Sequence, residues 1–208
     1  MSDGDNRPPD PPTSYLARDA KDGDADRFAR LYDRVAPAVF AWATLRIRPS
    51  VRALVDPEDV VQEVWCRALR RFHTFDAENA PFRPWVFRMA NNVLLEAFKA
   101  LRGHPVPRGG ADGSTSRKLL AMEGVPDEAT SISRKVSRHE GLNRFLEQVM
   151  TLSQEDRRLL LYRGLEGLAH CEVAERIGVG EDTVRKRWQR LRTHLETLGV
   201  PEELFETR

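Results

Sequence analysis

The chain has 208 residues, of which 40% are hydrophobic and 31% charged, and its formal net charge is only +1. This length suits one domain or two small ones, and the composition is that of a soluble globular protein without an apolar run long enough to span a membrane. Cys66 and Cys171 lie far apart, and the N-terminus is acidic and proline-rich where a signal peptide is basic and apolar, so we expect free thiols and a cytoplasmic protein.

The chain opens with a segment that cannot form a core. Residues 1–24 are rich in Pro, Asp and Gly and hold few large apolar side chains, which predicts a disordered acidic tail. From residue 26 onward apolar side chains recur at steps of three and four, the period of an amphipathic helix. These are Phe28, Leu31, Tyr32, Val35, Val39 and Trp42. We expect Pro37 to bend or interrupt this helix.

The next helix has a clear start signal. Asp56 can cap the first turn, Pro57 suits the first helical position, and Glu58 and Asp59 place negative charge at the N-terminal end of the helix dipole. Its apolar stripe comprises Val61, Val64, Trp65, Ala68, Leu69 and Phe72. After the turn-prone stretch HTFDAENAPFRP a third periodic segment follows, with Val86, Met89, Ala90, Val93, Ala97 and Leu101 on one side. Three such helices predict a small bundle over residues 25–102.

A change of composition marks a boundary after this bundle. Residues 103–137 gather Gly, Pro and Ser, as a flexible linker does. A second helical unit is predicted over 138–199, where Ser153 and the acids after it form a capping signal, and a short C-terminal tail over 200–208. No segment alternates like a strand, so we predict an all-α fold of two small helical domains.

The most informative stretch is GLAHCEVAERIGVGEDTVRKRWQRLRTHL, residues 167–195, which has the pattern of a helix-turn-helix. Gly178 supplies the permissive turn residue, and Gly180 can cap the second helix. In that helix the inward stripe is predicted to be Val184, Trp188, Leu191 and Leu195. The basic and amide residues outside this stripe have the chemistry to enter a major groove, where Arg and Lys pair with guanine, Gln with adenine, and flanking cations with phosphate. A merely solvated basic face is the alternative interpretation of the same pattern.

Together the two halves resemble the extracytoplasmic-function sigma factors, group 4 of the bacterial sigma-70 family. DPEDVVQEVWCRALRRF (56–72) and FRPWVFRMANNVLLEAF (82–98) are similar to the family's second sigma domain, and residues 152–195 are similar to its fourth. The resemblance implies a transcription initiation factor that binds core RNA polymerase and promoter DNA, with an anti-sigma protein as a further partner. It implies no catalysis, no cofactor, no metal and no membrane insertion.

The resemblance also assigns residues to three surfaces. The polymerase-binding helix corresponds to Asp59, Gln62 and Glu63. The region that opens and reads the proximal promoter element corresponds to Phe72, Phe75, Trp85, Arg88, Asn91 and Asn92. For Phe72 and Trp85 a place in the hydrophobic core is an equal alternative. The recognition helix for the distal element corresponds to Arg185, Lys186, Arg187, Gln189 and Arg190. The chain departs from the family in having Ala169 where a Ser or Thr usually caps the first helix of the motif, which forfeits about 1 kcal/mol.

Two other interpretations of the sequence compete with this one. A helix-turn-helix regulator that does not bind core polymerase would account for the second half of the chain only. An enzyme is disfavoured because the five histidines are scattered and no nucleophile or phosphate-binding motif is present. His170 beside Cys171 lacks the paired spacing of a zinc site.

Overall fold

The computed structural model describes residues 17, 25–103, 117–120, 122, 124, 126–198 and 204–205. Within these residues every regular element is a helix, which confirms the predicted all-α class. No helix of the described chain has the length and apolar character needed to cross a membrane. The predicted tail, residues 1–24, lies outside the described residues apart from Ala17.

The first half of the chain forms a three-helix unit. Its long helices are α2 (Ala25–Arg46), α3 (Pro57–Arg71) and α4 (Phe82–Gly103), and the 3-10 turns η2 (Pro49–Val51) and η3 (Phe72–Thr74) lie between them. Helix α2 is not interrupted at Pro37. The residues on both sides of this proline, Ala36 and Ala38, are fully buried, so packing of the helix offsets the one backbone hydrogen bond that proline cannot make.

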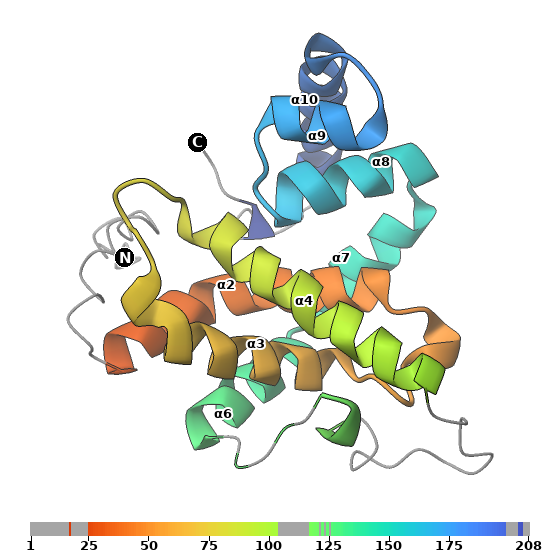
Figure 1. Cartoon of the computed structure of the whole chain (residues 1–208). Coiled ribbons are helices and arrows are strands. Elements are labelled where there is room, and N and C mark those ends of the chain that lie inside the picture. The colour runs from red at the N-terminus through yellow and green to blue at the C-terminus, as the bar shows by residue number, and fades with distance from the viewer. Residues whose placement is uncertain are drawn as a thin grey trace, which may run out of the picture.

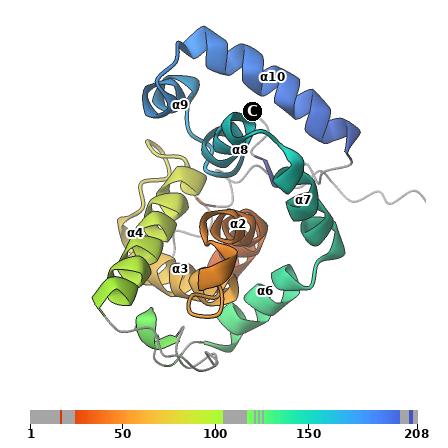
Figure 2. The same ribbon diagram turned by 90° about the vertical axis from the view of Figure 1, so that its right-hand side faces the viewer.

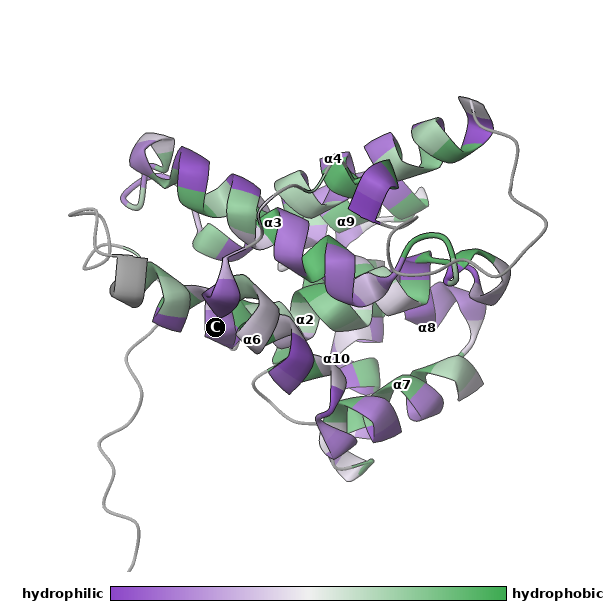
Figure 3. Ribbon diagram, turned by 90° about the horizontal axis from the view of Figure 1, so that it is seen from below, coloured by the Kyte–Doolittle hydropathy of each residue, from purple (hydrophilic) through white to green (hydrophobic). Residues whose placement is uncertain are grey.

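Helix α2 is the centre of the molecule. Figure 2 shows it nearly end-on, with α3, α4, α6, α7 and α8 arranged around it. Trp42 and Tyr32 of α2 are fully buried, and the Tyr32 hydroxyl donates a hydrogen bond of 2.8 Å to the Val61 carbonyl of α3. The surrounding helices each show hydrophilic and hydrophobic stretches (Figure 3), as amphipathic helices around a common core should.

The second half consists of shorter helices that continue around α2. They are α6 (Asp127–Ser137), α7 (Glu140–Thr151), α8 (Gln154–Leu159), the π-helical turn η4 (Leu160–Leu165), α9 (His170–Ile177) and α10 (Glu181–Thr197). Helix α6 lies inside the segment predicted as a linker. Its buried residues are Ala129, Ile132, Ser133 and Val136, which have the spacing of a helix. Only these four residues face the core, and the neighbouring Ser and Pro residues are typical of a linker, so the sequence did not indicate this helix.

The predicted helix starts are present with their capping groups. The Asp56 carboxylate accepts a 2.8 Å hydrogen bond from the Glu58 amide, and the Ser153 hydroxyl accepts one of 3.1 Å from the Asp156 amide. These side chains satisfy amides that the first turn of a helix leaves without partners, so they fix where α3 and α8 begin.

The two halves pack against each other (Figure 1). The indole Nε1 of Trp42 in α2 donates a 2.8 Å hydrogen bond to Glu166, which follows η4. The buried guanidinium of Arg83 in α4 donates to the carbonyl of Leu204, in the segment predicted as a C-terminal tail. Leu204 is itself only 2% exposed, so part of this tail belongs to the core.

Candidate functional site

Helices α9 and α10 form the helix-turn-helix that the sequence predicts. Gly178 adopts φ 72°, a left-handed conformation that suits glycine, and Gly180 caps α10 with extended backbone. Ala169 occupies the cap of α9 without a side-chain acceptor, but the Glu172 carboxylate accepts a 2.8 Å hydrogen bond from the Ala169 amide. The inward residues of α10 are buried at Val184, Leu191 and Leu195, while Trp188 is half-buried. Most of the other side chains of α10 are exposed.

The outward face of α10 carries the residues assigned to the distal promoter element. Arg185, Lys186, Gln189 and Arg190 are all exposed. The Arg185 guanidinium is held within its own helix by Asp182 at 2.8 Å and Glu181 at 2.9 Å. Arg187 is different, because it is half-buried and pairs with Glu155 of α8 at 2.6 Å. Its position favours a role in packing α10 onto α8.

The aromatic residues assigned to the proximal element divide into core and surface. Phe72 and Phe75 are 5% and 2% exposed, and their rings stack with centroids 5.9 Å apart. Trp85 is half-buried at the edge of this cluster, 5.0 Å from the Phe75 ring. Buried rings cannot stack on nucleic-acid bases in this conformation, so Phe72 and Phe75 belong to the hydrophobic core and only Trp85 is partly accessible.

The polar residues of α4 also differ in what they can reach. Arg88 and Asn92 are exposed, whereas Asn91 is half-buried. The Asn91 side chain donates to the Phe87 carbonyl at 2.9 Å and accepts from Arg46 of α2 at 2.7 Å. Asn91 therefore ties α4 to α2, and Asn92 is the asparagine that faces solvent.

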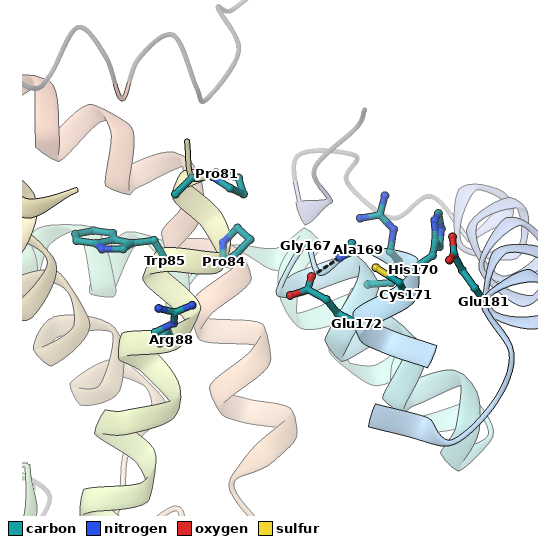
Figure 4. Close-up of a pocket in the computed structure, with 12 residues that line it drawn as sticks. Pro81, Pro84, Trp85, Arg88, Gly167, Ala169, His170, Cys171, Glu172 and Glu181 are labelled. Atoms are coloured by element: carbon teal, nitrogen blue, oxygen red, sulfur yellow. Dashed lines mark hydrogen bonds between the residues drawn. The ribbon is translucent and has the colours of Figure 1, made fainter. Parts of the chain in front are cut away.

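The start of α4 and the start of α9 face each other across a pocket of about 550 Å³. Trp85 and Arg88 lie on one wall, and His170, Glu172 and Glu181 lie on the other (Figure 4). The pKa of His170 is lowered, mainly by burial and then by the neighbouring charges of Arg163 and Arg185. Within the described part of the chain no three His, Cys, Asp or Glu side chains gather as a metal site would require.

The residues assigned to polymerase binding are covered. Asp59, Gln62 and Glu63 of α3 are 7%, 3% and 6% exposed. Helix α6 packs on α3 at Gln62, whereas Glu63 pairs with Arg67, which also binds Glu96 of α4. Gln62 donates a 2.9 Å hydrogen bond to the Ser133 hydroxyl of α6, and Asp59 lies 4.0 Å from the Arg117 guanidinium. The sequence places these residues on a face distinct from the apolar stripe, and gives no signal that the chain itself covers that face.

One polar contact between the halves was not predicted from the sequence. The Glu166 carboxylate is 2% exposed and binds Trp42 at 2.8 Å and Arg176 of α9 at 3.3 Å. Burial raises the pKa of Glu166, and the Trp42 hydrogen bond, Arg46 and Arg176 oppose that rise. Glu166 follows an apolar stretch in the sequence, but its partners lie 124 and 10 residues away, so no local pattern could identify them.

Comparison with known families agrees with this architecture. Sigma-70 region 2 matches residues 31–103, and sigma-70 region 4 matches residues 142–195. Together the two matches cover more than half of the chain and occur in the family's order, one on the three-helix unit and the other on the helix-turn-helix unit. The chain belongs to the sigma-70 family.

The individual relatives that it matches include ECF RNA polymerase sigma factors. The chain is 28% identical over 170 residues to the ECF RNA polymerase sigma factor BldN of Streptomyces coelicolor, covering 82% of this chain and 59% of BldN. It is 32% identical over 158 residues to the ECF RNA polymerase sigma factor SigG of Mycobacterium tuberculosis, covering 70% of this chain and 42% of SigG. The chain thus spans less than two thirds of the length of either relative. Among solved structures, that of CnrH in complex with the cytosolic domain of CnrY matches at 23% identity with a TM-score of 0.41, covering 89% of this chain and 96% of the matched chain.

Proposed function

We propose that the chain is an extracytoplasmic-function sigma factor, which binds core RNA polymerase in the cytoplasm and directs promoter recognition, strand opening and transcription initiation. One observation carries this proposal: the two sigma-70 regions occur on separate helical units, and the second presents an exposed basic and amide face on α10. In this role the chain binds and positions nucleic acid and polymerase, and it catalyses no reaction itself.

We assign residues to each step by the exposure of their side chains. Arg185 and Gln189 lie one turn apart on α10, where they are placed to meet neighbouring base pairs in a major groove. Lys186 and Arg190 supply charge for phosphate contacts. At the proximal element we assign Trp85 to base stacking, Arg88 to the backbone and Asn92 to a base edge. Asp59, Gln62 and Glu63 remain the proposed contact to polymerase.

The test is in vitro transcription with purified core polymerase and a library of genomic promoter fragments. We expect promoter-specific transcripts only when the chain is added, and permanganate-reactive thymines near the start site on the promoters used. Asn92→Ala should reduce this strand opening while leaving distal-element binding intact. Absence of stimulated transcription on every fragment would contradict the proposal.

Stoichiometric binding to core polymerase distinguishes this function from that of a helix-turn-helix regulator. A sigma factor should co-elute with core enzyme in size-exclusion chromatography, whereas a regulator of that kind binds duplex DNA without it. We also propose an anti-sigma protein as a partner, in keeping with the family. It should compete with core polymerase for the chain in the same assay.

A further inference from the structure

Helix α6 covers the surface of α3 that the proposed function needs. The helix packs on both α3 and α2, and it buries Ala129, Ile132, Ser133 and Val136 there. Arg117, which precedes α6 in the chain, lies 4.0 Å from the Asp59 carboxylate. Both Arg117 and α6 lie between the two family matches, so the cover comes from the segment that joins the sigma regions.

The three polymerase-facing residues are engaged with their own chain. Gln62 donates to Ser133 and Asp59 pairs with Arg117, while Glu63 pairs with Arg67 of α3 at 2.5 Å. With exposed fractions of 7% or less, none of the three can form an interface with another protein in this arrangement. Binding of polymerase through Gln62 therefore requires α6 to move away.

The polar contacts that hold α6 and its preceding segment on α3 are weak, as expected for a contact that must open. The Gln62 side-chain oxygen is buried and accepts no hydrogen bond from the described residues. Arg117 is 55% exposed and sits 4.0 Å from Asp59, a separation at which solvent weakens an ion pair. An unsatisfied buried acceptor raises the free energy of the covered state relative to a state in which that oxygen meets water or a partner, and an exposed ion pair adds little to offset this cost.

We propose that α6 is an intramolecular mask of the polymerase-binding face of α3, so that the chain alternates between a covered form and an open form that binds core polymerase. The inference rests on the proposed function. Its thermodynamic consequence is direct, because the apparent Kd for polymerase equals the intrinsic Kd divided by the fraction of open chain. Any change that weakens the α6 contact without altering α3 should tighten polymerase binding.

The experiment measures the affinity of the full-length chain for purified core polymerase. Ser133→Ala removes the acceptor of the Gln62 hydrogen bond, and Ser131→Ala, on the exposed side of the same helix, is the matched control because it changes helix propensity equally. Val136→Asp places a charge in the α6 contact, and Ser131→Asp is its control. We expect Ser133→Ala to lower the Kd by about threefold and Val136→Asp by about tenfold, with the controls equal to the parent.

The possible outcomes separate this inference from the function on which it rests. If parent and variants bind polymerase with equal affinity, or if the Ser133 and Val136 variants bind more weakly while keeping the parent's circular dichroism, the masking role is overturned and the sigma function stands. If Val136→Asp fails to fold, Ser133→Ala decides by the same criterion. If neither the parent nor any variant binds core polymerase, the proposed function itself fails.

Discussion

Arg185 shows how one side chain can be committed to its own helix and still be a candidate for base recognition. Its guanidinium bridges Asp182 and Glu181, all three on the exposed first turns of α10. Exposed pairs of this kind contribute little to stability, so a guanine edge that offers two acceptors can replace them. The two carboxylates would then lie near DNA, and they would penalise sequences that do not supply the compensating contact to Arg185.

Substitutions along α10 should therefore differ in whether they reduce sequence preference or overall DNA affinity. Arg185→Ala or Gln189→Ala should relax preference at particular distal-element positions by about 1 to 3 kcal/mol, because a bidentate base contact is lost. Arg190→Ala should weaken binding to all sequences alike and reduce the salt dependence by about one unit. The measurement uses the polymerase holoenzyme and promoters that differ only in the distal element.

Arg192→Ala serves as the control for these variants, since Arg192 pairs with Glu196 at 2.9 Å near the end of the helix. Equal losses on every sequence for Arg185, Gln189 and Arg190 would show that the helix supplies charge and reads no bases.

For single elements, the sequence was sufficient to predict those features that neighbouring residues determine. The cap at Asp56, the left-handed Gly178 and the inward stripe of α10 follow from neighbouring residues, and all were predicted. The cover of α6 over Gln62 was not predictable, because it joins residues 71 positions apart and depends on a four-residue face in a segment rich in Ser and Pro. The burial of Phe75, which the resemblance assigns to the proximal promoter element, likewise depends on contacts with Phe82 and Trp85 of the next helix.

The incomplete cap of α9 gives a prediction for that element. Ala169 has the extended backbone of a cap residue, with φ −63° and ψ 154°, and Glu172 already accepts from its amide. Ala169→Ser adds the missing acceptor for the Glu172 amide and should raise the free energy of unfolding by about 1 kcal/mol. Urea denaturation followed by circular dichroism measures it. Cys171→Ser also introduces a serine, but inside the first turn of α9, and should not raise the free energy of unfolding comparably.

For the whole molecule, the Glu166 contact makes the packing of the two halves sensitive to pH. The carboxylate is buried between Trp42 of α2 and Arg176 of α9, and burial raises its pKa above the ordinary value of 4.5. A carboxyl whose pKa is raised on folding binds its proton more tightly in the folded state, so its ionised form costs stability. That cost is complete above the raised pKa, decreases as the pH falls through it, and disappears below 4.5.

Glu166→Gln should remove this dependence, because the amide oxygen can still accept from Trp42 and carries no charge. We expect the parent to gain stability relative to the variant as the pH is lowered from about 7.5 to about 5, measured by urea unfolding at each pH. Glu147→Gln, at an exposed position on α7, corrects for the general effect of removing a negative charge. If the difference in free energy of unfolding between parent and variant is constant with pH, or changes in the opposite direction, then Arg176 and Trp42 offset or outweigh the effect of burial on the pKa of Glu166.

The contact between Leu204 and Arg83 has a practical consequence for how the chain is dissected. The region 4 match ends at residue 195, so a fragment cut there would lose the last two residues of α10 and the buried Leu204 side chain. It would also lose Phe205, whose ring lies 6.1 Å from the rings of both Phe145 and Trp188. A purification tag fused after residue 208 would add bulk only a few residues from this contact. Expression fragments of the second half should therefore extend past residue 205.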